Sequence, residues 1–315
     1  MMPALLLYLL KTQVALLLLL GVYYGLLRRL TFHQLNRAYL LAAMGFALLY
    51  PALDLSLLLP AAPASMSFTV SLSAWAAGPP GGRVPAPTSP DWGQWLLGAY
   101  WLGVAVLGLR LLVQLASLWR LHRSSRPVAV AGVGFRAVPG VVSPFSFGWH
   151  IYLNPVHHAA AELPIILQHE QVHVRQAHTL DVLLAHLHCA IVWWSPAAWL
   201  VLRAVQENLE FIADATVLRA GTVPAREYQY SLARLSTLAP VSTLASSFSL
   251  LTLKNRIRMM NSRSSSPRQL LRYAAGFALL TTLAVACATP HATEVPKPNA
   301  MAQQSGLPDE LTIIM

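Results

Sequence analysis

The stretch Leu163-Pro-Ile-Ile-Leu-Gln-His169-Glu170-Gln-Val-His173-Val-Arg-Gln-Ala-His178 decides how the rest of the chain is interpreted. Its composition favours a helix. Residues four apart share a helical face, so His169 and His173 can direct two imidazole nitrogens at one metal ion. Glu170 can accept a proton from water attacking beside that ion. The pattern predicts a Zn²⁺ cofactor, whereas the plainer alternative is the polar face of a surface helix.

A catalytic zinc site with one open position needs a third protein ligand. Glu210 and Asp214 lie four residues apart on a predicted helix about forty residues after the motif, and they share a face. This spacing suits Glu210 as the third ligand and Asp214 as a carboxylate that orients a bound imidazole. The reaction also needs a hydrogen-bond donor to the transition state. Tyr228 and Tyr230 are candidates that their spacing does not separate.

Two further residues follow the motif helix. Asp181 can accept the free N–H of a zinc-bound imidazole, with His178 three residues before it. A histidine at a helix C-terminus followed by a capping residue fits the sequence equally well. His157 and His158 precede the motif in a predicted loop, and we expect both to be exposed to solvent.

The composition is that of a membrane protein. Of 315 residues, 56% are hydrophobic and 11% are charged, whereas a soluble domain carries about a quarter charged residues. Four apolar runs are each long enough to cross a hydrocarbon layer of ~30 Å as a helix. They cover residues 3–27, 38–59, 92–112 with an amphipathic continuation to 121, and 270–288. Two cysteines are too few for a disulfide framework, and both lie in apolar stretches where buried thiols are expected.

Loop charges orient the predicted spans. The connection 28–37 holds three arginines and no acid, and the segment 118–269 is rich in arginine, whereas segment 60–91 and the tail are not. The positive-inside rule therefore predicts that 28–37 and 118–269 are cytoplasmic and that both termini are outside. The net charge of +10 does not gather on one face, so no direct nucleic-acid binding is expected.

A fifth apolar run, 182–202, is interrupted by Ser195-Pro196. If it crossed the membrane, His169 and Glu210 would lie ~30 Å apart, and ligand bonds of ~2 Å would be impossible. Provided that Glu210 is a ligand, we predict that this run consists of two helical segments and returns to the side it left.

The remaining cytoplasmic sequence predicts a mixed α and β domain. Residues 127–154 contain short β-branched runs separated by Gly and Pro, which predict short strands beside the motif helix. An extended substrate could pair with such a strand edge. Residues 222–238 favour a helix. The polar-small and basic segment 239–266 is predicted to be loop-like, and we expect a self-cleavage site there.

Further motifs surround the His-Glu-x-x-His stretch. They are Leu-Leu-Arg-Arg-Leu-Thr-Phe after the first span, Ser-Pro-Phe-Ser-Phe-Gly-Trp before the motif helix, and Trp-Trp-Ser-Pro-Ala-Ala-Trp, Glu-Asn-Leu-Glu-Phe-Ile-Ala-Asp and Leu-Lys-Asn-Arg-Ile-Arg-Met-Met after it. Together they resemble the membrane metallopeptidases of family M56, the group of the BlaR/MecR-type antibiotic-sensing signal transducers. The resemblance covers about residues 1–290.

The resemblance implies a mainly α membrane protein with four transmembrane helices. A gluzincin-like α+β zinc metallopeptidase domain is inserted between the third and fourth. The implied segments are 1–121 with a periplasmic 60–91 loop, 122–269 as the zinc domain, 270–288 as the fourth span, and 289–315 as an extracytoplasmic tail. The implied setting is a bacterial inner membrane.

The resemblance also implies roles for individual residues. It makes His169, His173 and Glu210 the ligands, Glu170 the catalytic base, and Asp214 a supporting residue. The activity implied is regulated cleavage of a cytoplasmic protein, typically a winged-helix repressor, and self-cleavage. The bilayer is the other expected partner, and a homodimer is an assembly that the sequence leaves open.

One departure from the antibiotic sensors matters. Those proteins carry a penicillin-binding domain with a Ser-x-x-Lys motif after the last span, whereas about 27 residues without that motif follow Ala288 here. β-lactam sensing through such a domain is therefore not supported. Two alternatives stay open: a quality-control membrane protease of the M48 type, and a zinc-binding signalling scaffold with little activity.

Overall fold

Long helices make up most of the molecule in the computed structural model, which describes residues 2–52, 92–130, 132–140, 142–238 and 243–287. The long helices are α1 (Met2–Val22), α2 (His33–Leu49), α3 (Trp92–Ser124), α4 (Leu163–Arg175), α5 (His178–Ile191), α6 (Pro196–Ala220), α7 (Ala225–Leu238), α8 (Thr243–Met260) and α9 (Leu271–Cys287). Short helical turns are η1 (Tyr23–Leu27), η2 (Tyr50–Ala52), η5 (Pro155–His157) and η6 (Pro267–Leu270).

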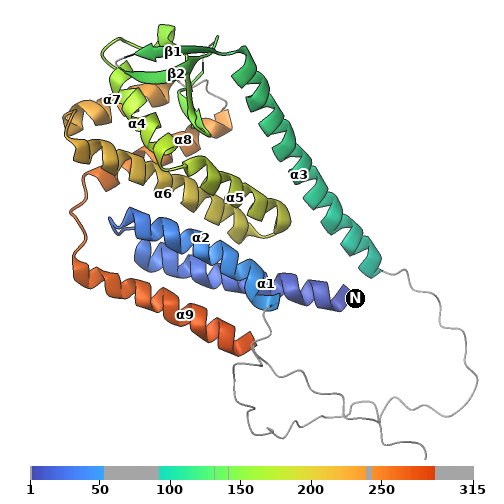
Figure 1. The fold of residues 1–315 in the computed structure, drawn as a ribbon. Helices are drawn as coiled ribbons and strands as arrows, with labels where there is room; N and C mark the ends of the chain where they lie inside the picture. The colour runs from blue at the N-terminus through green and yellow to red at the C-terminus, as the bar shows by residue number, and fades with distance from the viewer. Residues whose placement is uncertain (1, 53–91, 131, 141, 239–242, 288–315) are drawn as a thin grey trace, which may run out of the picture.

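Helices α1, α2 and α9 lie side by side, and α5 and α6 form the next layer (Figure 1). Helix α1 is apolar on nearly every face, so it buries leucines against α2 and α6. Buried polar groups fix the pairing: Tyr39 donates to the Leu19 carbonyl at 2.8 Å, and Asn36 donates to the Leu27 carbonyl at 3.2 Å. The Leu27 carbonyl also accepts a hydrogen bond from the Leu30 N–H at 2.8 Å, so Asn36 occupies its second acceptor position.

Two helices in the described part of the chain are long and apolar enough to cross a membrane, judged by length and composition. They cover Leu5–Leu27 and Trp92–Ser124. Helices α2 and α9 match the second and fourth predicted spans in position, but each has 17 described residues. Four crossings therefore stay a prediction. Segment 60–91 and the tail 289–315 lie outside the described residues.

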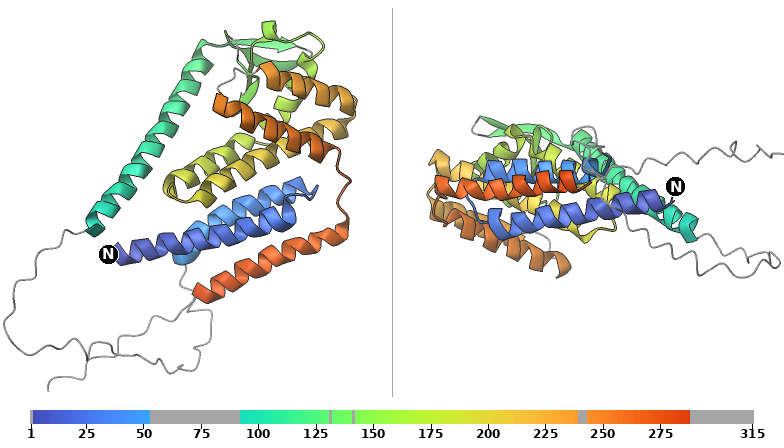
Figure 2. Two further views of the ribbon diagram at one scale, coloured as in Figure 1. Left: turned by 180° about the vertical axis from the view of Figure 1, so that it is seen from behind. Right: turned by 90° about the horizontal axis from the view of Figure 1, so that it is seen from below.

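Helix α3 runs obliquely along one side of the molecule, from the sheet towards the end of α1 at which the N-terminus lies (Figures 1 and 2). None of its 33 residues is buried. It is fixed to the turn between α5 and α6, because Trp193 donates to the Tyr100 carbonyl at 3.2 Å and Tyr100 donates to the Ile191 carbonyl at 3.1 Å. Gly103 is needed here, since a Cβ atom would overlap the Trp193 ring.

The fifth apolar run forms a helical hairpin, as the sequence predicts. Ser195 caps α6 by accepting a hydrogen bond from the Ala198 N–H at 3.4 Å, and Pro196 occupies the first turn. Helices α5 and α6 then pack against each other. Cys189 is buried in this hairpin, as expected, while the side chain of Cys287 lies outside the described part.

Helix α6 is the centre of the fold. It contacts α1, α2, α4, α5 and α8. Fourteen of its 25 residues are buried, with polar side chains such as Asn208 and Asp214 among them. Buried polar groups need hydrogen-bond partners. Asn208 donates to the His33 carbonyl at 3.0 Å, and Asp214 accepts a hydrogen bond from Tyr228 at 2.7 Å.

The predicted strands form a four-stranded sheet in the order β1-β2-β4-β3. The strands are β1 (Arg126–Val130), β2 (Val133–Ala137), β3 (Phe145–Phe147) and β4 (His150–Leu153). Strands β1 and β2 pair antiparallel, β2 and β4 parallel, and β3 and β4 antiparallel. One sheet face packs on α4 through a core that includes Phe135, Leu153 and Ile166. Strand β3 is at the edge that faces α4.

The helix over 222–238 is confirmed by α7, but the prediction for the next segment is wrong. Residues 243–260 form helix α8, not a loop. The local composition does not indicate a helix, and packing against α6 and α7 stabilises it instead. The residues from Asn261 to Ser266, between α8 and η6, are non-helical.

Candidate metal centre

Three predicted ligands converge between α4 and α6. The Nε2 atoms of His169 and His173 lie 3.2 Å apart. Carboxylate oxygens of Glu210 lie 3.3 Å from His169 Nε2 and 3.7 Å from His173 Nε2. The three donor atoms all fall within 4.8 Å of one another, so they can hold one metal ion. Two imidazoles and one carboxylate are a donor set found in catalytic zinc sites, and the residues therefore fit that ion.

A buried tyrosine links the first histidine to Asp214. The Tyr228 hydroxyl donates to Asp214 Oδ1 at 2.7 Å and lies 2.7 Å from His169 Nδ1. Burial, followed by the nearby Asp214 charge, raises the pKa of Tyr228, so it stays protonated. Its one proton is committed to Asp214, so His169 must donate its Nδ1–H to the tyrosine oxygen. This arrangement leaves His169 Nε2 facing the other ligands.

The second histidine is oriented by His178, not by Asp181. Ala177 adopts a left-handed conformation with φ of 52° between α4 and α5, and His178 then lies with its Nδ1 2.8 Å from His173 Nδ1. Burial, followed by the nearby His173, lowers the pKa of His178 to about 3. A neutral His178 can accept the Nδ1–H of His173 and leave its Nε2 free for metal. His178 begins α5, so the alternative that placed it at a helix C-terminus is wrong.

Asp181 has a different partner. Its two oxygens accept hydrogen bonds from Arg37, at 2.6 Å from Nε and 3.0 Å from Nη2. Both groups are largely buried, and the pair ties α2 to α5. The expectation that Asp181 orients a zinc-bound imidazole is therefore wrong in this geometry. The sequence could not indicate this ion pair, because Arg37 lies 144 residues before Asp181 in the chain.

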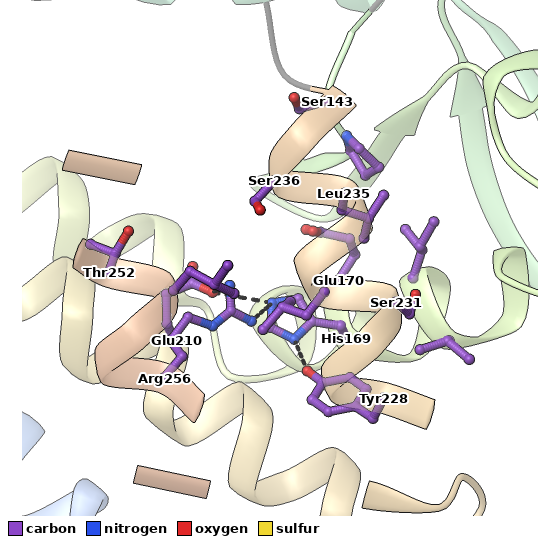
Figure 3. Close-up of a pocket in the computed structure, with 15 residues that line it drawn as sticks. Ser143, His169, Glu170, Glu210, Tyr228, Ser231, Leu235, Ser236, Thr252 and Arg256 are labelled. Atoms are coloured by element: carbon purple, nitrogen blue, oxygen red, sulfur yellow. Dashed lines mark hydrogen bonds and ion pairs between the residues drawn. The ribbon is translucent and has the colours of Figure 1, made fainter. Parts of the chain in front are cut away.

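Arg256 of α8 also belongs to the site. Its guanidinium donates to Asp214 at 2.9 and 2.6 Å and lies 2.9 Å from Glu210 Oε2. Figure 3 shows Arg256 and Glu210 pointing at His169 from one side, with Tyr228 on another. Burial alone would raise the pKa of Glu210, but Arg256 and the two imidazoles outweigh burial and hold it well below its ordinary value. The carboxylate ligand is therefore ionised.

The charges around His169 determine how readily its imidazole ring is protonated. Burial and the nearby Arg256 charge lower the pKa of His169, but the hydrogen bond to Glu210 and the charges of Glu210 and Asp214 more than offset them, and the net shift is upward. A proton and a metal ion therefore compete for Nε2 of His169, so metal affinity depends on pH.

Glu170 lies on the strand side of the ligands. Burial raises the pKa of its carboxyl group above the ordinary value, against the opposing charge of His169 and a hydrogen bond to the Ser146 side chain. A raised pKa suits a group that takes a proton during catalysis. Ser146 belongs to the edge strand β3, so the base and the strand edge meet at one place.

Two pockets flank the carboxylates of Glu170 and Glu210. One of about 260 Å³ lies between α4, α7 and α8, and Ile166, Leu232 and Leu235 are among its lining residues. Figure 3 shows the α7 residues of this hollow along one helix. The other, of about 360 Å³, is lined by β3, α5 and α6, including Phe145 and Leu183. Glu170 and Glu210 line both, so the reactive groups lie between two partly apolar pockets.

Other predicted residues take different places. His157 is exposed as expected, but the expectation for His158 is wrong, because its side chain is buried, with 9% exposed. Tyr230 is 75% exposed and Tyr228 is 2% exposed. The sequence contained a signal for this difference: Tyr228, Leu232 and Leu235 are spaced as one apolar face of α7. Arg256 had no such signal, because it stands in a basic run that also fits membrane orientation.

A group of residues able to hold a metal ion and two helices long enough to cross a membrane point to a membrane-associated metallopeptidase. The family model described as BlaR1 peptidase M56 matches residues 96–260 of the chain, from α3 to the end of α8. The chain belongs to this family, which confirms the resemblance seen in its motifs. No curated protein matches the sequence.

Proposed function

We propose that this chain is an integral-membrane zinc endopeptidase that relays a signal by cutting a cytoplasmic protein. In this proposal His169, His173 and Glu210 hold the metal, and Glu170 is the base. The observation that carries it is the convergence of the three donors within 4.8 Å from two different helices. Membership of a peptidase family supports the same chemistry.

The chain's own residues perform most of the work that hydrolysis requires. A zinc ion held by His169, His173 and Glu210 would supply Lewis acidity to the carbonyl that is attacked. Glu170 accepts the proton of the attacking water and delivers it to the leaving amine. Tyr228 with Asp214 and His178 keep the two ligand imidazoles in the tautomers that leave both Nε2 atoms available.

Strand β3 is the element that would position a substrate. It pairs with β4 on one side only among the described strands, so its other edge can accept an extended peptide. Ser146 in the middle of β3 lies next to Glu170. A peptide paired there would pass its carbonyl groups in front of Glu170 and place side chains in the two flanking hollows.

The proposal includes a topology and a partner. It keeps four membrane crossings, a cytoplasmic zinc domain and external termini in a bacterial inner membrane. It is supported by Arg28 and Arg37 at the two ends of the 28–37 connection, because their ion pairs to Glu207 and Asp181 hold that connection against the helices of the site. A winged-helix repressor is the proposed substrate, with the chain itself as a second one, and a homodimer is the proposed assembly.

The decisive experiment compares Glu170→Gln with Glu227→Gln, an exposed acid on α7. We expect one zinc per purified chain in all three proteins, measured by mass spectrometry of the metal. Cleavage of a proteome-derived peptide library should fall by about 10²–10⁴-fold in Glu170→Gln only. Correctly folded wild-type protein without metal, or unchanged cleavage in Glu170→Gln, would contradict the proposal.

The scaffold and the M48-type alternatives give other results in the same experiment. A scaffold would bind zinc and signal equally well with Glu170→Gln. A quality-control protease would degrade unfolded membrane proteins, and its loss would not change the abundance of one transcriptional repressor. No structural observation favours either alternative over the proposed function.

A further inference from the structure

A third pocket lies away from the metal centre, where the end of η1 meets α6 and α8. Its volume is about 240 Å³, and the residues that line it include Tyr24, Arg28, Arg29, Glu207 and Arg258. Three of these are arginines and one is an acid. No role in metal binding or hydrolysis falls to this pocket, so its concentration of cationic groups needs a separate explanation.

The acid in the pocket is already saturated. Glu207 accepts two hydrogen bonds from Arg28, at 3.0 and 2.9 Å, and a third from Asn255 at 2.6 Å. Arg28 and Glu207 therefore cancel each other's charge. The bidentate pair uses the Nε–H and one Nη2–H of Arg28, so the other N–H groups of its guanidinium are not committed to Glu207.

The other two arginines carry the net charge. Arg29 and Arg258 are exposed, and neither makes an ion pair or a hydrogen bond with any residue in the described part of the chain. Together they give the pocket two positive charges that are not balanced by Glu207. Arginine presents a planar fork of donors that matches the oxygens of a phosphate group.

The pocket lies at the end of the first helix that is long and apolar enough to cross a membrane. Arg28 and Arg29 directly follow Leu27, the last residue of the stretch that can cross a membrane. The Arg28 guanidinium lies over the Tyr24 ring at 5.1 Å from the centroid. Tyrosine on the apolar side and arginine on the polar side are typical of the depth at which lipid phosphate groups lie.

We propose that this pocket binds a phosphate group through Arg29 and Arg258, with Arg28 and the Tyr24 ring as its wall. The phosphate could come from the headgroup of an anionic phospholipid or from a free phosphate anion, and the chemistry of the contact is the same. Arginines that only orient the helix in the membrane would need no pocket and would bind no phosphate saturably.

The test uses the full-length protein and the double variant Arg29→Gln/Arg258→Gln. The matched control is Arg126→Gln/Arg226→Gln, which removes two exposed arginines elsewhere. In the lipid arm, native mass spectrometry measures the phosphatidylglycerol retained in mixed phosphatidylglycerol and phosphatidylcholine nanodiscs. In the phosphate arm, delipidated protein in neutral detergent is titrated with inorganic phosphate against chloride at equal ionic strength, and the thermal midpoint is followed.

We expect the pocket variant to bind phosphate about thirtyfold more weakly than the wild type, while the control double variant binds as the wild type does. Saturable binding in the lipid arm assigns the source to a headgroup, and binding in the phosphate arm alone assigns it to a soluble anion. Equal binding by the pocket variant and the wild type, or no saturable binding in either arm, would overturn the proposal.

Metal content and the thermal midpoint of the unliganded variant check that it is folded. Both changed side chains are exposed, so little loss of stability is expected. If the double variant does not fold, the single reversal Arg258→Glu replaces it in both arms. Loss of phosphate binding by that variant, with normal metal content, supports the proposal, and retention of binding overturns it.

Discussion

Replacing Tyr228 with phenylalanine isolates the hydroxyl group that joins His169 to Asp214. The ring and its packing stay, and two hydrogen bonds of 2.7 Å disappear. Asp214 Oδ1 keeps its bond from Arg256 at 2.6 Å. The Nδ1–H of the buried His169 then has no partner at hydrogen-bond distance, because Asp214 Oδ1 lies 3.6 Å away. The His169 ring can therefore rotate and turn Nε2 away from the metal site.

The expected loss of zinc affinity follows from the one N–H group of His169 that loses its hydrogen-bond partner. A buried polar group without a partner costs about 1–3 kcal/mol. Loss of an outer hydrogen bond to a ligand histidine typically weakens metal affinity by about 10–100-fold, which corresponds to about 1.4–2.7 kcal/mol. The two routes agree, so we expect the zinc dissociation constant of Tyr228→Phe to rise by about 10–100-fold.

The assay is competition between the metal-free protein and a chromogenic chelator at pH 7.5. The control is Tyr230→Phe, since Tyr230 is two residues further on the same helix and is 75% exposed. Its affinity should stay within about twofold of the wild type. Equal affinities for the two variants would refute the conclusion that the tyrosine hydroxyl orients His169.

Three further changes test the surrounding contacts. Arg256→Gln leaves Asp214 and Glu210 without their buried cation, so thermal unfolding of the metal-free protein should show a loss of about 3–5 kcal/mol; exposed Lys254→Gln should show none, and equal midpoints would contradict the ion pairs. Asp181→Asn should lower the thermal midpoint because it breaks the pair with Arg37, yet leave zinc affinity unchanged; a large loss of affinity would restore Asp181 as a partner of a ligand. Burial lowers the pKa of His33 to about 4, below its unfolded value of about 6.5, so its contribution is complete above pH 6.5 and lost as the pH falls. The wild type should lose about 2 kcal/mol from this group between pH 7.5 and pH 5. In denaturant titrations at the two pH values, His33→Gln should therefore lose about 2 kcal/mol less than the wild type, and an equal loss would contradict a buried, neutral His33.

The sequence predicted those parts of the fold that depend on local pattern. The apolar runs became long helices, the β-branched runs became strands, and Ser195-Pro196 ended one helix and began the next. These features follow from hydrophobic period and capping, which are properties of neighbouring residues. Helix α8 was missed because its stability comes from contacts with α6 and α7, which no local pattern records.

The site divides in the same way. His169 and His173 are one helical turn apart, so they share a face. Glu210 is a carboxylate on a second predicted helix, which is the third ligand that such a pair requires. The convergence of the three could therefore be predicted. Tyr228 and Arg256 lie 59 and 87 residues from His169, and only packing brings them to it. Asp181 was misassigned because several acids could have faced a histidine, and the choice among them depended on where Arg37 lay.

Helix α8 changes what self-cleavage in segment 239–266 requires. A peptidase binds its substrate as an extended chain, whereas residues 243–260 are helical and supply Arg256 to both Asp214 and Glu210. A cut within α8 would therefore need the helix to unwind and the guanidinium to leave two carboxylates of the metal centre. Residues from Asn261 to Ser266 need no such unwinding. Two hydrogen bonds between Thr31 and Ser265, of 2.9 and 2.8 Å, hold this segment to the connection between η1 and α2. The physical cost of exposing a bond thus favours cleavage after α8 over cleavage inside it, and the two fragments would differ measurably in mass.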